Sequence, residues 1–299
     1  MRGNGEKPVV KKKHKAVWTV LIIVCAAVFL VSGGMLLHYA LEYHQIDSDN
    51  EQIVQLLDQE PTQEQIDALP EDAQEEAAAA YSTNPDFIGS ITIPNTVIHY
   101  AVVQTTDNET YLNTSFYGTY SRLGTVFADY RCRITSQGMS DNTILYGHNA
   151  NNGSFFHELT NYTSASYASG HSTVQFDTIY QDQTYVVIGA FLADPDATGG
   201  DRFDYQNYID FSQRDFDTFK EQITQRSYFH TSLEWDETDQ YLTLSTCDYD
   251  INNGRIVVVA RALREGETAD AAVGTYTDNT NQRMPDVWYT SRNMDNPFL

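Results

Sequence analysis

The sequence predicts a mainly β domain with helical inserts, joined to an N-terminal transmembrane helix. Residues 16–37 carry no charged side chain, which is typical of a membrane span. Between residues 84 and 264, short runs of β-branched and aromatic residues alternate with Gly, Pro, Asn and Asp, a pattern typical of strands and turns. A length of 299 residues allows this tether and one sizeable domain, or two.

The apolar run favours a retained transmembrane helix over residues 16–38. At the rise of an α-helix the run would span roughly 33 Å, close to the hydrocarbon core of a bilayer. A cleaved signal peptide is the alternative, because a basic segment precedes the run. The run is longer than a signal-peptide core, however, and lacks a clear cleavage site. The lysines of residues 1–15 predict a cytoplasmic tail, so everything from about residue 40 is expected outside the cell.

Residues 39–83 are expected to form an acidic helical stalk. Residues 42–80 contain 12 Asp or Glu and no Lys or Arg. Apolar residues at helical spacing, such as Ile53 and Leu57, predict short helices that Pro61 and Pro70 interrupt. The self-repelling charge favours a solvated linker. The alternative is a docking surface, and a short helix packed on the domain is compatible with either.

The folded domain, residues 84–264, is expected to contain eight strands. They are Ser90–Ile93, Val97–Val103, Thr125–Asp129, Asn142–Tyr146, Thr173–Phe176, Thr184–Leu192, Tyr241–Cys247 and Arg255–Leu263. Short strands separated by turns predict a closed barrel or a sandwich.

Two helical inserts interrupt the strands, and a tail follows them. One helix is expected at Ser154–Leu159, and a longer one near Ser212–Arg226 that starts with an acidic capping box at Ser212 and Asp215. Residues 265–299 lose the pattern and are expected to form a polar, flexible C-terminal tail. The alternative is that the aromatic residues of this tail dock on the barrel.

Charge and cysteine content exclude some classes of function. Lys and Arg number 18 against 41 Asp and Glu, which argues against nucleic acid as a partner. Three cysteines cannot form a disulfide framework. Cys247 ends a predicted strand, and an unpaired thiol outside the cell is either buried and inert or kept for its reactivity.

Three side chains at strand ends predict a nucleophilic site. Taken alone, Cys247 would be a small buried hydrophobic residue. His148 follows an apolar strand closed by Gly147, so an imidazole and a thiol can meet at one rim of a barrel. Arg255 opens the next strand and can donate hydrogen bonds to a carbonyl oxygen that gains negative charge. Arg261 and Arg264, farther along that strand, are expected to face outward for solubility.

At these residues the sequence resembles the sortases, transpeptidases that attach proteins to Gram-positive cell walls. Three motifs carry the resemblance, in the order Tyr146-Gly147-His148, Leu244-Ser245-Thr246-Cys247 and Gly254-Arg255-Ile256-Val257-Val258-Val259-Ala260. The stretches 84–89, 93–100, 104–113 and 124–129, with the long helix before the Cys247 strand, resemble class B members. The resemblance covers about residues 84–264 and implies an eight-stranded β-barrel.

The resemblance also implies roles and partners. Cys247 would be the nucleophile, His148 the general acid and Arg255 the stabiliser of the oxyanion. The expected substrate groove contains Asn108, Leu112, Ser245 and Phe203. The donor would be a surface protein with a sorting signal of Asn-Pro-x-Thr type, and the acceptor an amine of the peptidoglycan cross-bridge or its lipid-linked precursor. No cofactor and no metal is implied.

Three alternatives stay open. A papain-type peptidase also pairs Cys with His, but places the Cys on a helix and before the His. A non-catalytic surface binding module with the same barrel would keep its activity without Cys247. A pilin-polymerising sortase would use the same chemistry with a different acceptor amine.

Overall fold

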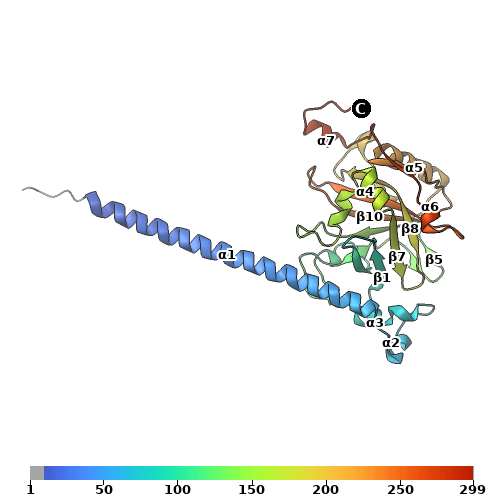
Figure 1. Ribbon diagram of the computed structural model, residues 1–299, viewed down its shortest axis with the longest axis horizontal. Helices are drawn as coiled ribbons and strands as arrows, with labels where there is room; N and C mark the ends of the chain where they lie inside the picture. Colours follow the sequence, from blue (N-terminus) through green and yellow to red (C-terminus); the bar gives the residue numbers. More distant parts are fainter. Residues whose placement is uncertain (1–9, 299) are drawn as a thin grey trace, which may run out of the picture. The chain divides into compact units, whose positions relative to one another are not determined.

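The N-terminal helix is long and apolar. The computed structural model describes residues 10–298, so residues 1–9 of the predicted cytoplasmic tail lie outside the described residues. Helix α1 (Val10–Leu57) is 48 residues long (Figure 1). By length and composition its apolar part can cross a membrane, and the large apolar side chains from Val17 to Leu41 are exposed. The chain divides after Asp49 into two compact units, and the second contains all the remaining elements.

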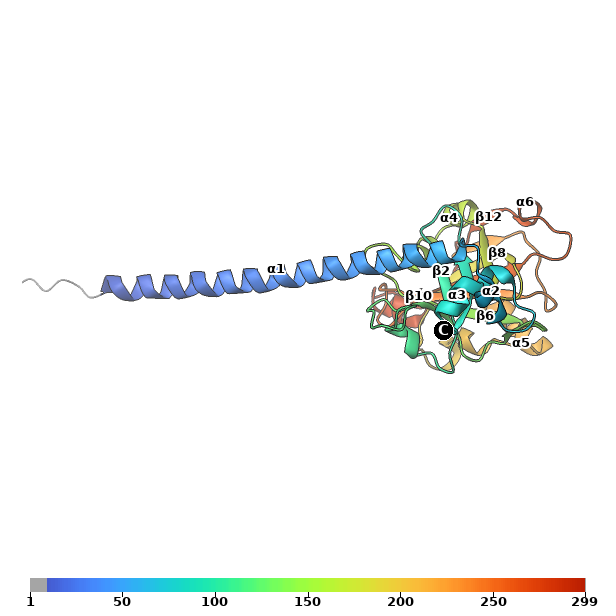
Figure 2. The same ribbon diagram turned by 90° about the horizontal axis from the view of Figure 1, so that it is seen from below.

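The segment expected as a solvated stalk contributes to the core of the second unit. Pro61 and Pro70 bracket helix α2 (Gln63–Asp67), which starts at a capping box of Thr62 and Gln65. The 3-10 helix η1 (Glu75–Ala77) leads into α3 (Ala78–Thr83), which lies beside α2 (Figure 2). Ile53 and Ala80 are buried in a cluster with residues of the barrel strands. The apolar spacing therefore outweighs the acidic composition, and the stalk is only partly a solvated linker.

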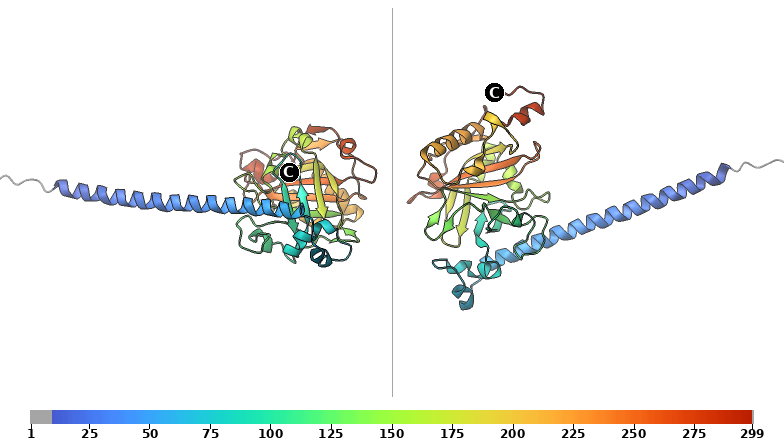
Figure 3. Two further views of the ribbon diagram at one scale, coloured as in Figure 1. Left: turned by 60° about the horizontal axis from the view of Figure 1, so that its bottom comes forward. Right: turned by 180° about the vertical axis from the view of Figure 1, so that it is seen from behind.

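Eight strands form a closed barrel. Of the two architectures that the strand pattern allowed, barrel and sandwich, the protein therefore has the barrel. The strands are β1 (Phe87–Thr92), β2 (His99–Val103), β3 (Val126–Ala128), β6 (Asn142–Tyr146), β7 (Thr173–Thr178), β8 (Thr184–Ala193), β10 (Tyr241–Cys247) and β11 (Arg255–Ala262). Figure 3 shows the barrel in two views, and the order of the strands around it is β1-β2-β3-β6-β10-β11-β8-β7. The pairs β2/β3 and β6/β10 are parallel and the rest are antiparallel.

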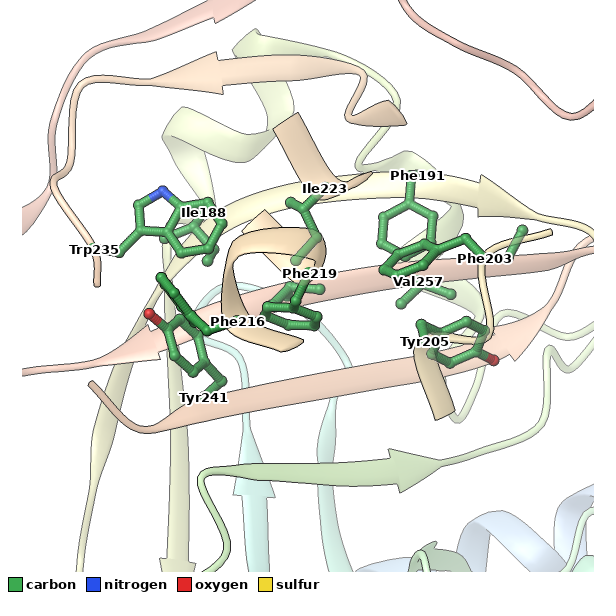
Figure 4. Close-up of a cluster of buried hydrophobic side chains, with 12 residues drawn as sticks. Ile188, Phe191, Phe203, Tyr205, Phe216, Phe219, Ile223, Trp235, Tyr241 and Val257 are labelled. Carbon is green, nitrogen blue, oxygen red and sulfur yellow. The ribbon is translucent and has the colours of Figure 1, made fainter. Parts of the chain in front are cut away.

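Helix α5 (Gln213–Arg226) covers one face of this barrel, as its apolar face predicts. Ser212 caps it and Asp215 completes the capping box. Phe216, Phe219 and Ile223 pack in a cluster with side chains of β8, β10 and β11 (Figure 4). The cluster holds the outside of β10 and β11 rigidly, so the ends of these strands are well-defined positions for functional groups.

The short elements depart more from prediction. The helix expected at Ser154–Leu159 is instead the 3-10 helix η3 (His157–Asn161). The other short elements are η2 (Thr110–Leu112), β4 (Ile134–Thr135), β5 (Gly138–Met139), α4 (Ala165–Gly170), η4 (Gly199–Asp201), η5 (Tyr205–Asn207), β9 (Phe229–Thr231), α6 (Ala269–Ala272), β12 (Tyr276–Asp278) and α7 (Asp286–Thr290).

Two expectations near the C-terminus need correction. Much of the segment expected as a flexible tail is ordered, because β12 pairs with β9 and Tyr289 of α7 is buried with Leu192 of the barrel. Arg261 does not face outward: it is fully buried and its guanidinium pairs with Glu267. The ion pair and a hydrogen bond to the Ala262 carbonyl make this burial tolerable. Arg264 is half-exposed and binds Asp239 and Asp236.

Candidate active site

Three strands bring Cys247, Arg255 and the segment of His148 to one edge of the barrel. β6 and β10 are parallel, with Tyr146 opposite Ser245, so both strands end at this edge. β10 and β11 are antiparallel, with Cys247 directly opposite Arg255. Directly opposed residues project their side chains to the same face, with Cβ atoms about 5 Å apart. His148 follows β6 by two residues.

A surface cleft at this edge is lined by all three of these side chains. Of the residues expected to bind substrate, Asn108, Leu112 and Ser245 also line it, together with Tyr146 and Gln206. Phe203 lies elsewhere: it is 8 % exposed and packs against Phe191 and Tyr208 in the cluster beneath α5. Its neighbour Tyr205 reaches the site indirectly, because its hydroxyl lies 2.8 Å from Ser245 Oγ. Burial raises the pKa of Tyr205 to about 12, so this hydroxyl keeps its proton at neutral pH.

His148 is oriented by the backbone around it. A Cβ atom on Gly147 would lie 2.8 Å from the Phe156 ring, so only glycine allows this close packing. The Gly147 N–H donates to the Ser245 carbonyl, and the Phe156 N–H donates to the His148 carbonyl. His148 Nε2 lies 2.9 Å from the Leu112 carbonyl oxygen. A carbonyl can only accept, so Nε2 carries a proton in this contact and can act as a donor in the cleft.

Asn149 fixes the end of the Cys247 strand. Its Nδ2 donates to the Cys247 carbonyl over 2.8 Å, and His157 Nδ1 lies 2.7 Å from its Oδ1. Asn149 is therefore held on both sides of its amide. The supporting role of Asn149 is not predictable from the sequence, because Asn149 and Cys247 are 98 positions apart. The only available signal was that Asn149 directly follows His148.

Arg255 is held by the loop that precedes it. Its guanidinium donates to the Asn253 carbonyl over 3.0 Å, to Asn253 Oδ1 over 3.2 Å and to the Gly254 carbonyl over 2.9 Å. All three bonds come from one nitrogen, Nη1. The pose of the guanidinium thus depends on the conformation of the loop.

A buried carboxylate supports the other side of the cleft. Asp129 accepts hydrogen bonds from Arg131, from the Tyr146 hydroxyl and from Asn108 Nδ2. Burial raises the pKa of Asp129, but the hydrogen bonds from Arg131 and Tyr146 outweigh it, and the net pKa lies below the usual value. Asn108 Oδ1 accepts from the Tyr130 N–H. Both ends of the Asn108 amide are thus bound within the protein, and Asp129 is a site-supporting residue that the sequence did not reveal.

Replacing Asp129 by asparagine is expected to lower the free energy of unfolding by about 2–3 kcal/mol at pH 7. The carboxylate is buried while Arg131 is one-third exposed, so the loss is smaller than for a wholly buried pair. Because the folded pKa is depressed, this stabilisation is present above the unfolded pKa of about 3.9 and is lost as pH falls through the folded value. Urea unfolding of wild type and Asp129→Asn at pH 7 and pH 3 measures it, with the exposed Glu109→Gln as control. A gap between the curves that widens at pH 3 would contradict the assignment.

Comparison of the sequence with known proteins shows which protein family this chain belongs to. A sequence model of the sortase domain matches residues 91–263. This chain is a sortase. Two related proteins are both sortase B. That of Listeria monocytogenes is 28 % identical over 249 residues, covering 81 % of this chain and 95 % of the relative. That of Staphylococcus aureus is 30 % identical over 186 residues, covering 60 % and 72 %.

Solved structures of sortase B have the same fold. The S. aureus sortase B–substrate complex superposes with a TM-score of 0.64 at 26 % identity, covering 76 % of this chain and 100 % of that one. Sortase B from B. anthracis gives a TM-score of 0.63 at 26 % identity, covering 75 % and 99 %. The resemblance to class B is therefore confirmed, and the chain is a cysteine transpeptidase of the kind that sorts proteins to the cell wall.

Proposed function

We propose that this sortase cleaves a sorting signal of Asn-Pro-x-Thr type and transfers the protein to an amine of the cell-wall peptidoglycan. The observation that carries the proposal is the pairing of Cys247 with Arg255 across β10 and β11, at the mouth of the cleft that also contains His148. The signal type rests on the class B relationship. Asn108, Leu112 and Ser245 are the proposed groove residues, whereas Phe203 packs beneath α5 and is not part of the proposed groove.

The first half-reaction forms a thioester. The Cys247 thiolate attacks the threonine carbonyl carbon, a C–S bond forms and the oxygen gains negative charge. Arg255 donates hydrogen bonds to that oxygen, as a charged donor fixed in place does best. His148 then gives its proton to the leaving nitrogen as the C–N bond breaks. The acyl group stays on Cys247 and the signal fragment departs.

The second half-reaction releases the product. An acceptor amine attacks the thioester carbonyl, a C–N bond forms and the C–S bond breaks, so that Cys247 leaves as a thiolate. The proton lost by the amine restores the acid form of His148, and the cycle closes without a cofactor. Among the side chains that the structure describes, those of residues 17–298, no group of three or more His, Cys, Asp or Glu is arranged to hold a metal ion.

We also propose that α1 anchors the enzyme, with residues 1–15 in the cytoplasm and the catalytic domain, residues 84–264, outside. The support is the exposed apolar stretch of α1 and the lysines that precede it. Both substrates in this proposal are found at the outer membrane surface, where a tethered enzyme meets them.

Incubating the full chain in detergent with Asn-Pro-x-Thr and Leu-Pro-x-Thr peptides tests the proposed chemistry. We expect mass spectrometry to trap an acyl group on Cys247 with the Asn-Pro-x-Thr peptide, and added amine-bearing peptides to convert it to an amide product. An adduct with the Leu-Pro-x-Thr peptide alone would overturn the signal assignment. The absence of any adduct on Cys247 with either peptide would overturn the mechanism.

A further inference from the structure

The C-terminal segment, defined here as residues 276–292, packs on the loop that joins Cys247 to Arg255. It lies outside the part of the chain that matches the sortase domain, residues 91–263. Trp288 Nε1 donates to Asp250 Oδ2 over 2.8 Å, and Arg292 donates to Asp250 Oδ1 over 2.6 Å. The Arg292 guanidinium also lies 4.3 Å from the centre of the Trp288 ring. Both carboxylate oxygens of one loop residue are thus bound by this segment.

Apolar packing joins the same two parts of the chain. Ile251, the next residue of the loop, is 6 % exposed and clusters with Met284 and Tyr289 of the segment and with Leu192 of β8. Burying one isoleucine side chain of this kind is a substantial contribution to holding a short loop. The loop is therefore held by an ion pair, a hydrogen bond and an apolar contact from one segment.

The segment is itself attached to the body of the domain, independently of the loop. Gln282 donates to the Arg226 carbonyl over 3.0 Å, and Arg283 donates to the Gly200 carbonyl over 2.8 Å. The Asp286 N–H donates to Asp201 Oδ2 over 2.8 Å, and β12 pairs with β9. Because these contacts do not involve the loop, the segment can hold the loop against a fixed frame. Figure 1 shows α7 at one end of the domain.

The loop in turn sets the position of Arg255. The Asp248 N–H donates to the Gly254 carbonyl, and the Gly254 N–H donates to the Ile251 carbonyl, so the loop is a closed turn. Asn253 and Gly254 then accept the three hydrogen bonds of the Arg255 guanidinium. Val287 and Ser291 of the segment line a second hollow, which Cys247 and Arg255 also line. The contacts run from Trp288 and Arg292 through Asp250 and the turn of the loop to the Arg255 guanidinium.

We propose that Trp288 and Arg292 are positioning residues for transpeptidation: by binding Asp250 they hold the β10–β11 loop in the conformation that aims Arg255 at the substrate oxyanion. The inference rests on the proposed function, in which Arg255 acts on that oxygen. When the contacts are removed, the loop occupies other conformations for part of the time. The rate of acylation falls in proportion to the fraction of molecules that keep Arg255 in place.

Reversal of the ion pair in the full chain tests this. Arg292→Glu and Asp250→Lys are each expected to lower kcat/KM for acyl-enzyme formation with the sorting peptide about five- to tenfold, the range that loss of a charge-assisted pair allows. The double variant restores an ion pair of opposite sense and is expected to return to within about threefold of wild type. Arg214→Glu, the same charge change on the exposed face of α5, is the matched control and should leave kcat/KM unchanged.

A second readout separates positioning from folding. Alkylation of Cys247 by iodoacetamide needs no oxyanion donor, so its rate is expected to be unchanged in the single variants. Loss of both acylation and alkylation, with a lower unfolding midpoint, would show a merely structural role and overturn the proposal. Wild-type kcat/KM in Arg292→Glu would overturn it as well. If wild type itself forms no acyl-enzyme, the proposed function fails, and this inference fails with it because Arg255 then has no oxyanion to bind.

Discussion

Replacing Cys247 by alanine is expected to abolish acyl-enzyme formation and transpeptidation, with kcat/KM falling by at least about 10⁴-fold. The reason is that neither His148 nor Ser245, which line the cleft beside Cys247, can take over the role of the thiolate. His148 is a ring donor bound to the Leu112 carbonyl, and Ser245 Oγ is buried and paired with the Tyr205 hydroxyl. Product release from a fluorogenic sorting peptide measures the loss. Binding of the peptide should survive, because the groove is unchanged.

Cys132 provides the matched control for this prediction. It is 4 % exposed, its Sγ lies 3.7 Å from the Asn142 carbonyl oxygen, and it accepts a hydrogen bond from the Ile144 N–H. Burial raises the pKa of Cys132 to about 12, so it is a thiol at neutral pH and a poor nucleophile. Cys132→Ala should therefore retain activity. Equal losses in the two variants would place the effect in stability rather than in chemistry.

The barrel was predictable because its strands carry their own signal. β6 and β10 have the bounds expected from period-2 patterning, and the other barrel strands differ by a few residues at their ends. Two-residue strands such as β4 carry too little pattern to be recognised. The burial of Arg261 could not be read from its own strand either. A charged side chain on β11 is expected to face solvent. Arg261 is buried because Glu267, which lies beyond the end of the strand, forms an ion pair with it.

The residues of the candidate site were also predictable only in part. The sequence predicted that Cys247, Arg255 and His148 come together at the ends of neighbouring strands, and all three line one cleft. The residues that support them could not be predicted, because each acts through a contact between distant parts of the chain. Asn149 binds the Cys247 carbonyl, Asp129 holds Asn108, and Asp250 is bound by a segment that lacks any strand pattern. Phe203 was expected in the groove but packs beneath α5. An apolar ring fits either environment, and the sequence alone does not distinguish between them.

Replacing His148 by glutamine is expected to lower kcat/KM for peptide cleavage by about 10²–10⁴-fold, the usual contribution of a positioned general acid. Glutamine keeps a donor near the Leu112 carbonyl but has no proton to transfer, so geometry is retained while acid catalysis is lost. His230→Gln, at an exposed position on β9, is the control and should behave as wild type.

The leaving group distinguishes general acid catalysis from simple disruption of the cleft. An amine must be protonated as it departs, whereas the thiolate of a thioester substrate departs without a proton. His148→Gln should therefore lose far more activity on the peptide than on a thioester carrying the same Asn-Pro-x-Thr acyl group. Equal losses on both substrates would mean that His148 acts before C–N cleavage, by helping to form or hold the Cys247 thiolate. Because Nε2 is the donor atom of this ring in its contact with the Leu112 carbonyl, we expect the unequal result.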